Sequence, residues 1–480
     1  MIIAKKSYKI YHICLLFGKI RYFLDAGTGM KKTIITLLVI LLLGAIYYVT
    51  LGSSKLVEAM KKEVNHRVVT LEDNGFDISN RIIDKKTEHF VITAENPDAI
   101  QRYLAQHGIQ TQLEYIQLFQ DQKIGVDIEY LPNVSDAIAM DIYPLNLPRV
   151  IYEQSKPYDK TTIERFEQMI NDKVFLIHIA INKLGNAFDG YIQDINQTFV
   201  IDGNQSSLLV ENWTFKGTLN RYRINRVSQK LGLLNYILHD IASITLNSIN
   251  LSLDTTVDTN KTIHYFAESM SITSKSNNEQ SSLRLHGLNG TSMEQTSDHI
   301  LNSRNKLDID FIELSDKKKY QKIDHIAIDI SLNNLNLNAI KQLQELDVLQ
   351  NEDNQSIKRL IPLLKELTDA NTSIDIHTIS VTSITEDNQT YKGFDLSGHT
   401  QLDKQFNWDN LNSDHPMQLV SLINLRANLI LSDKIVEMIA KDPKLIMFMM
   451  LMQPKDYNGS KIYELDYING SLKINGKRLF

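Results

Sequence analysis

The sequence IAIDISLNNLNL, residues 326–337, carries the pattern that decides the fold. Isoleucine and leucine alternate with small or polar residues along almost its whole length. Because successive side chains of a β-strand point to opposite faces, such a segment buries one face and exposes the other. The pattern therefore predicts a long strand in an antiparallel sheet with one apolar and one polar face.

The same alternation extends on the N-terminal side of this segment, in residues 244–253, 283–288 and 307–311. The polar positions hold mostly Ser, Thr, Asn and Asp. We expect residues 243–335 to form meandering antiparallel hairpins. Further upstream, β-branched and aromatic segments predict shorter strands, with helices over 97–106 and 160–172 between them.

Downstream, the period changes to that of a helix and then back to that of a strand. Ser432 and Asp433 are expected to cap a helix, and Asn469-Gly470 and Asn475-Gly476 predict tight hairpin turns. The expected helices cover 338–349, 356–370, 434–440 and 444–452, and the expected strands cover 373–384, 391–403 and 418–431. The apolar segment KLIMFMMLM, 444–452, indicates a helix packed between sheets, and a helix that touches lipid is the alternative.

Residues 33–51, TIITLLVILLLGAIYYVTL, are uncharged and almost wholly apolar. Nineteen helical residues reach about 28 Å, close to the thickness of the bilayer core. Lys31 and Lys32 precede the segment, while Tyr47 and Tyr48 lie near its other end. We interpret it as a transmembrane signal anchor. A cleaved signal peptide is the alternative, although the apolar region is long for one.

The chain offers two possible starts. Met30-Lys31-Lys32 is typical of the beginning of a bacterial anchor, and a start at Met30 would leave residues 1–29 untranslated. If they are made, their basic side chains keep them in the cytoplasm. The first 32 residues carry a net charge of +6, which leaves the remainder near −12 and argues against a nucleic-acid partner. Cys14 is the sole cysteine, so the exported region holds no disulfide.

The fold class that follows is α+β and β-rich: long twisted antiparallel sheets with a few helical inserts, preceded by one N-terminal transmembrane helix. The predicted organisation is a cytoplasmic basic segment at 1–32, an anchor at 33–52, an amphipathic stalk at 53–72, a β-rich region at 73–240, and a second β-rich region at 241–480 with inserts near 338–370 and 432–452.

The anchor at Met30-Lys31-Lys32, the Asn-rich alternating strands and the closing sequence YINGSLKINGKRL, residues 467–479, together resemble the YdgA-like family of bacterial envelope proteins. This family is known as a domain of unknown function. The resemblance implies an inner-membrane anchor and a bulk in the periplasm. It implies no activity and no cofactor.

Motifs for catalysis or metal binding are not found. The sequence AGTGMKKT, 26–33, lacks the spacing of a phosphate-binding loop. His178 and His325 lie in apolar strand patterns, where a hydrogen-bonded structural role is expected. The histidines have no cysteine or Glu-x-x-His partners that would form a zinc site. No catalytic, cofactor or metal residue is therefore nominated, and we do not expect an enzyme.

Asparagine sequons are the one remaining signal. Seven Asn-x-Ser/Thr sequons have an acidic residue two positions before the asparagine, which resembles the extended acceptor of bacterial N-glycosylation. The candidate sites are Asn196, Asn204, Asn260, Asn354, Asn371, Asn388 and Asn458. The alternative is that Asp and Asn gather in turns for conformational reasons, without a glycan.

We therefore expect a single-pass, inner-membrane-anchored periplasmic protein that binds a lipid or another envelope protein. Large sheets must cover their apolar face, and any part left uncovered becomes a hydrophobic trough. A scaffold or sensor for inner-membrane complexes is the first alternative. A periplasmic enzyme whose site is assembled from distant residues is the second.

Overall fold

The structure is a computed structural model. It describes residues 53–106, 111–133, 135–149, 160–201, 204–220, 223–239, 241–257, 259–276, 279–317, 319–345, 354–408, 416–441 and 453–479. The predicted basic segment, the anchor at 33–52 and the apolar helix at 444–452 lie outside these residues. Within them, no helix is long and apolar enough to cross a membrane.

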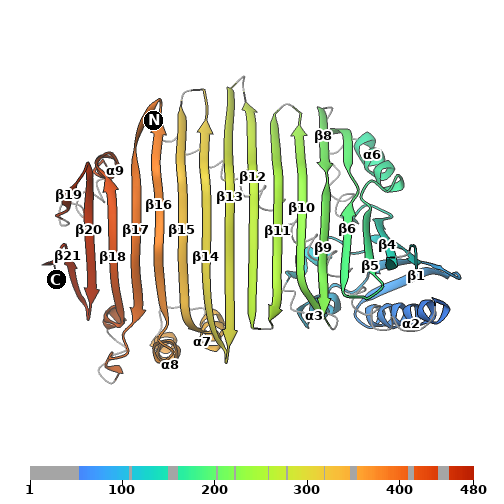
Figure 1. The fold of residues 1–480 in the computed structure, drawn as a ribbon, viewed down its shortest axis with the longest axis horizontal. Helices are drawn as coiled ribbons and strands as arrows, with labels where there is room; N and C mark the ends of the chain where they lie inside the picture. Colours follow the sequence, from blue (N-terminus) through green and yellow to red (C-terminus); the bar gives the residue numbers. More distant parts are fainter. Residues whose placement is uncertain are drawn as a thin grey trace. The chain divides into compact units, whose positions relative to one another are not determined.

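The chain divides into two compact units, residues 1–227 and 228–480. The sequence places the division near residue 240, within a few residues of the end of strand β10 (Arg223–Leu238), which crosses the boundary. Strands dominate the described residues and their pairings are antiparallel, which confirms the β-rich part of the predicted fold class. Figure 1 shows the strands with a few helices beside them.

Unit 1 is built on a meander in which β1 to β6 pair in order and β9 pairs with β6. A separate hairpin joins β7 and β8. Its elements are α2 (Ser53–Glu72), β1 (Phe76–Ile83), β2 (Thr87–Ala94), α3 (Pro97–Gln106), α4 (Leu113–Gln117), β3 (Lys123–Tyr130), β4 (Asp136–Pro144), α6 (Lys160–Asn171), β5 (Ile177–Asn182), β6 (Ala187–Ile192), β7 (Ile195–Ile201), β8 (Asn204–Glu211) and β9 (Trp213–Asn220).

Helices cover the apolar face of the unit 1 sheet. The segment predicted as a stalk forms α2, and its Met60, Val64, Val68 and Leu71 belong to the same buried cluster as the strands. Helix α3, predicted with the same bounds, adds side chains that include the fully buried Leu104. Unit 1 therefore has a closed core made of one sheet and its covering helices.

A buried carboxylate lies in this core. The Glu88 side chain is 0% exposed and receives hydrogen bonds from the Tyr130 hydroxyl (2.7 Å) and from Nε of Arg81 (2.8 Å). Burial, together with this carboxylate, raises the pKa of Tyr130. Because a buried charge needs a partner, the three side chains act as one interdependent set.

Unit 2 is a broader sheet in which β11 to β18 pair in order and β20 follows β18. Strands β19 and β21 pair with β20, and β22 pairs with β21. Its elements are β11 (Ala242–Val257), β12 (Asn260–Ser276), β13 (Glu279–Ser297), β14 (Ile300–Ser315), β15 (Tyr320–Asn336), α7 (Leu337–Glu345), α8 (Asn354–Asp369), β16 (Ser373–Glu386), β17 (Gln389–Leu402), η2 (Pro416–Leu422), β18 (Ile423–Ser432), α9 (Asp433–Ile439), β19 (Lys455–Tyr457), β20 (Ser460–Ile468), β21 (Ser471–Ile474) and β22 (Lys477–Arg478).

Local signals in the C-terminal part are confirmed. Ser432 caps α9, with its hydroxyl accepting a hydrogen bond from the amide of Ile435 (3.3 Å). The turns Asn469-Gly470 and Asn475-Gly476 have positive φ at both residues, as this turn type requires. The strand predicted over 418–431 is wrong in its first part, because Pro416–Leu422 forms a 3₁₀ helix. Proline fixes φ near the helical value and lacks an amide for the ladder.

Candidate functional site: the apolar face of unit 2

The register of the unit 2 strands brings their apolar residues into transverse rows. In antiparallel sheets, directly opposed residues project from the same face. The central row consists of Leu251, Tyr265, Gly290, Leu307, Ile328, Ile379, Leu396, Leu429 and Tyr463, one residue from each of nine consecutive strands and each opposed to the next. The alternation seen in single segments therefore forms one continuous apolar face.

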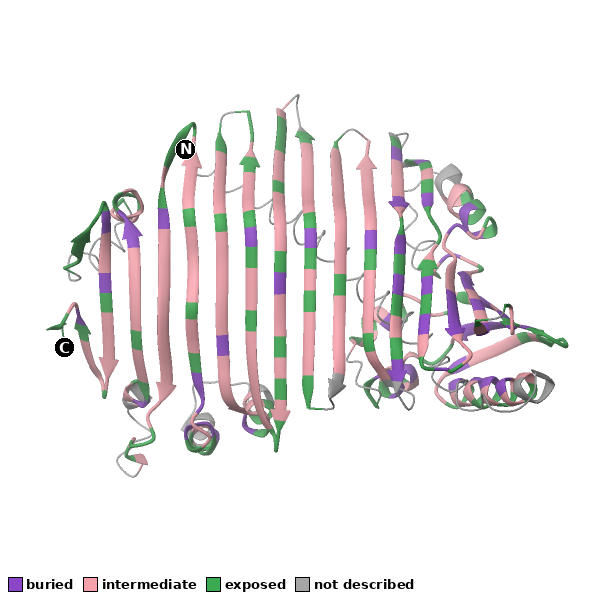
Figure 2. Cartoon of the chain, in the orientation of Figure 1, coloured by how far each residue is buried: buried purple, intermediate pink, exposed green. Residues whose placement is uncertain are grey.

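Among the described residues, no helix covers a large part of this face in unit 2. Figure 2 shows intermediate burial along most of β11 to β17. Leu251, Leu314 and Ile374 keep 37%, 42% and 38% of their surface exposed. Among the described hydrophobic residues of β11 to β16, only Ala267 and Ile309 are buried. The side chains thus contact their lateral neighbours while their outer surfaces stay accessible.

The described helices of unit 2 lie near the strand ends or on the C-terminal side of this face. Helices α7 and α8 contact β15, and Figure 1 shows them near the ends of the strands. Helix α9 contacts β17, β18 and β20, where Ile435, Val436 and Ile439 pack around Leu431 and Tyr463. The C-terminal side of the face is therefore covered. We call the part from β11 to β16 the open face.

The open face is large for a surface patch. Six strands about 4.8 Å apart, with about ten residues of apolar rows along each, give an area on the order of 800 Å². The largest apolar patch on a typical monomer is about 300–600 Å² and is often functional. The open face is therefore the candidate binding site of unit 2.

The opposite face of the sheet is polar, and its side chains form hydrogen bonds with side chains of neighbouring strands. Arg304 binds Asp329 through two hydrogen bonds of 2.8 Å, and these hold the pKa of the Asp329 carboxyl below its usual value. His399 contacts Asp375 at 2.6 Å, and Ser331 contacts His377 at 2.8 Å. These networks suit a water-facing surface, which sets the polarity of the sheet.

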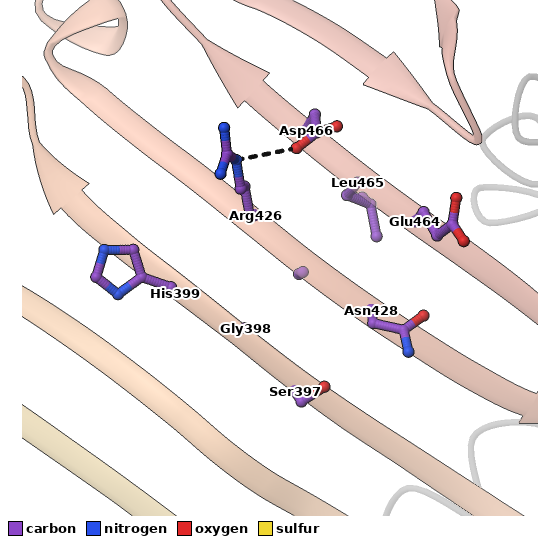
Figure 3. A pocket seen from close by; sticks show the side chains of 9 residues that line it. Ser397, Gly398, His399, Arg426, Asn428, Glu464, Leu465 and Asp466 are labelled. Atoms are coloured by element: carbon purple, nitrogen blue, oxygen red, sulfur yellow. Dashed lines mark ion pairs between the residues drawn. The ribbon is translucent and has the colours of Figure 1, made fainter.

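A shallow polar depression of about 440 Å³ lies on β17, β18 and β20. Figure 3 shows His399, Arg426 and Asp466 on neighbouring strands, with the Arg426–Asp466 ion pair (3.4 Å) marked. The Arg426 side chain is 73% exposed and the Asp466 side chain is 49% exposed. Ion pairs at this exposure contribute little binding energy, and the depression is open to solvent.

Unit 1 carries a polar row of its own. His89, Asp127, Asp141 and His178 are directly opposed in that order on β2 to β5. Each histidine contacts its aspartate through Nδ1 at 2.7 Å. Burial raises the pKa of Asp127, but hydrogen bonds from His89, Tyr143 and Lys173 outweigh it, so the pKa is lowered. The Lys173 ammonium also lies 3.6 Å from the centre of the Tyr143 ring.

The two histidines singled out in the sequence have different settings. His178 is hydrogen-bonded, as expected, and stacks on Tyr191. His325 lies within strand β15, as expected, but it is exposed and has a left-handed backbone (φ 48°). Its expected hydrogen-bonded role stays a prediction. Among the described residues, no group of three or more His, Cys, Asp or Glu side chains could hold a metal ion.

The candidate glycosylation sites are scattered over strands and turns. Asn196 is exposed on β7, and Asn260 is exposed at the tip of the β11–β12 hairpin. Asn371, Asn388 and Asn458 have φ values of 63°, 71° and 48°, as turn residues do. Asn204 and Asn354 begin β8 and α8. These left-handed conformations favour the turn explanation at three sites, and glycosylation stays a prediction.

Comparisons with known proteins leave the family open. No protein-family model matches this chain, and neither a curated protein nor a solved structure matches it. The resemblance to the YdgA-like family therefore stays a prediction. The function proposed below rests on the apolar composition of the open face.

Proposed function

We propose that this is a membrane-anchored, non-enzymatic protein of the bacterial envelope, and that its open face binds acyl chains of membrane lipids. The anchor predicted at residues 33–52 would hold the protein at the inner membrane with its bulk in the periplasm. The observation that carries the proposal is the continuity of the apolar rows across β11 to β16.

The composition of the face favours acyl chains over a protein partner. The cores of protein interfaces are enriched in aromatic residues, Met and Arg, and carry about one hydrogen bond per 100–200 Å². The open face consists mainly of Ile and Leu, and the backbone groups beneath it are used by the strand ladder. Such a surface offers non-directional contact only, which suits fluid hydrocarbon chains.

The energetics are also adequate. Burial of apolar surface contributes roughly 25 cal/mol per Å². Contact with a few hundred Å² of hydrocarbon therefore stabilises a complex by several kcal/mol before the ordering of the chains is subtracted. A lipid bound in this way is expected to remain on the protein in mild detergent.

Native mass spectrometry of the full chain, purified from bacterial membranes in mild detergent, tests the proposal. The wild-type protein is expected to carry phospholipid. The double variant Ile328→Glu with Ile379→Glu places two charges in the centre of the open face, where these residues oppose each other. We expect it to lose at least 90% of the lipid.

The matched control is Ala327→Glu with Ser380→Glu. These two residues oppose each other one position away, on the polar face of the same strands. The control introduces the same like-charge pair and the same backbone context, so it is expected to keep its lipid. Lipid-free wild-type protein, or equal loss in both double variants, would contradict the proposal.

A further inference from the structure

The alternation in unit 2 contains one irregularity that recurs on every strand from β11 to β17. Apolar-face residues normally lie two positions apart, but at a shared point along the strands they lie three apart. The pairs are Leu246 and Ile249, Ala267 and Met270, Leu285 and Leu288, Ile309 and Ile312, Ile323 and Ile326, Val381 and Ile384, and Tyr391 and Phe394. At this shared point each strand thus contains one extra residue between two apolar neighbours. β15 and β16 each have a second step of three, Leu332 to Leu335 and Ile376 to Ile379, at register shifts of their own ladders.

The register places these extra residues side by side. Ser248 lies between the opposed pairs Asn247–Ser269 and Ile249–Ala267 of the β11–β12 ladder and so faces Glu268. The same register continues across the next five ladders. We call the resulting set the extra-residue line. It consists of Ser248, Glu268, Gly287, Asp310, His325, Thr382 and Gly393.

The backbone along the line departs from regular strand geometry. Ser248, Gly287 and His325, on alternate strands, have φ values of 51°, 66° and 48°. A Cβ on Gly287 would lie 1.9 Å from the Asp310 carboxylate, and one on Gly393 would lie 1.9 Å from the Val381 carbonyl oxygen. The glycines at these two positions are therefore required by the local packing.

The extra residues oppose one another one-to-one, so they differ from a β-bulge, in which two residues oppose one; like a bulge, each interrupts the regular alternation of its strand. Here the additional length lies on the polar side, because two residues separate the apolar neighbours where one is usual. The polar side would then be the longer one at this line, and such a difference in length would curve the sheet away from it. Bulges at matching positions on neighbouring strands are a means of curving a whole sheet.

We propose that the extra-residue line makes the open face concave and forms a gutter that runs across the strands, in which phospholipid acyl chains lie parallel to the transverse rows. This inference rests on the proposed lipid binding and adds the direction of the bound chains. The two rows that flank the line are apolar on all six strands. They are Leu246, Met270, Leu285, Ile312, Ile323 and Ile384 on one side, and Ile249, Ala267, Leu288, Ile309, Ile326 and Val381 on the other.

The direction follows from the curvature. A chain that lies along the axis of a gutter contacts both flanking rows over its whole length, whereas a chain along a strand crosses the bend once and leaves the surface on either side. Over five strand spacings, the gutter offers about 24 Å of continuous apolar contact.

Photoreactive lipids test the direction on the unmodified protein. Two phosphatidylglycerols are used, one with a diazirine near the carboxyl end of its acyl chain and one with the diazirine near the terminal methyl. After reconstitution and irradiation, the labelled residues are mapped by peptide mass spectrometry. We expect the two probes to label different strands within the same pair of flanking rows.

Each outcome bears on a separate claim. If the two probes label the same strand at positions displaced along it, the chains lie along the strands and the inference is overturned. If neither probe labels β11 to β16, the proposed lipid binding fails and the inference fails with it. Labelling on the polar face alone would have the same consequence.

A glycine pair tests the line independently. Gly287→Ala places a Cβ against Asp310, while Gly476→Ala adds a Cβ at a similar φ (81°) in a turn where nothing lies within 4 Å. At equal folded fraction by circular dichroism, Gly287→Ala is expected to bind at least threefold less phosphatidylglycerol than Gly476→Ala. Equal binding by two folded variants overturns the role of the line. If Gly287→Ala does not fold, the probe experiment decides.

Discussion

Phe90 and Val126 in unit 1 are fully buried, whereas Leu251 and Ile374, which occupy apolar-face positions of unit 2 strands, keep more than a third of their surface exposed. Both pairs come from alternating strands of similar composition. The difference lies in what covers them, since helices α2 and α3 pack on the unit 1 sheet and no helix packs on most of the described open face. The alternating sequence thus determines that one face of a sheet is apolar. Whether that face becomes a buried core depends on whether helices pack on it.

The largest difference between the units is expected from the buried carboxylate of unit 1. Glu88→Ala leaves the Arg81 guanidinium and the Tyr130 hydroxyl without their acceptor inside the core. Removal of one partner from a buried ion pair costs about 3–5 kcal/mol. Hydrogen exchange monitored by mass spectrometry should show loss of protection in the peptides of unit 1.

The control for this substitution is Glu268→Ala, because Glu268 is exposed on unit 2. Its effect should stay within about 0.5 kcal/mol, as is usual for surface positions. A small effect of Glu88→Ala would show that unit 1 is not closed around this carboxylate.

Truncation of one aliphatic side chain in each unit compares the closed core with the open face. Leu104→Ala removes a side chain with 0% exposure and is expected to cost about 2–5 kcal/mol. Ile328→Ala on the half-buried central row should cost about 1 kcal/mol, because no sealed cavity forms. Urea unfolding followed by hydrogen exchange of each unit measures both values in lipid-free detergent. Equal costs would mean that a further layer covers the open face.

The smallest effect is expected at the polar row of unit 1. The pKa of Asp127 is lowered in the folded protein, so this carboxylate contributes stability above its unfolded pKa of about 3.9 and loses it as the pH falls through the folded value. Lys173→Met removes a contact of 3.2 Å. Because both groups are partly exposed, the loss at pH 7 should be well under 1 kcal/mol.

This pH dependence has a defined sign. The stability difference between wild type and Lys173→Met should be largest near pH 7, should shrink as the pH falls below about 4, and should vanish only once the pH is below the lowered folded pKa of Asp127. Chemical denaturation at pH 7 and pH 3 measures it. A difference that grows toward acid pH would contradict the assignment of Asp127 as the partner of Lys173.

The sequence predicts much of the local structure, because local signals determine it. Asn96-Pro97 opens α3 at the predicted residue, Ser432 caps α9, and the Asn-Gly pairs form the closing turns. The covering of unit 1 by α2 could not be predicted. Its amphipathic pattern shows that one side is apolar but does not identify the sheet that buries this side.

The candidate site was only partly visible in the sequence. The apolar strands were predicted and so was a trough wherever helices leave them uncovered. The extra-residue line was missed, although its signal is present, since Leu285 and Leu288 or Ile323 and Ile326 break the period of two. In a single strand, one three-residue step between apolar residues does not differ from an ordinary irregularity of the sequence. Its meaning depends on the register, which aligns seven steps from strands far apart in the chain.

The most direct test of the open face is a comparison of two adjacent positions that project to opposite sides of β15. A photoreactive benzoylphenylalanine is introduced at Ile328 or at Ala327 in the full chain, and intact bacteria are irradiated. We expect a phospholipid adduct at residue 328 and none at residue 327. A protein adduct at residue 328, or equal lipid labelling at both positions, would contradict it.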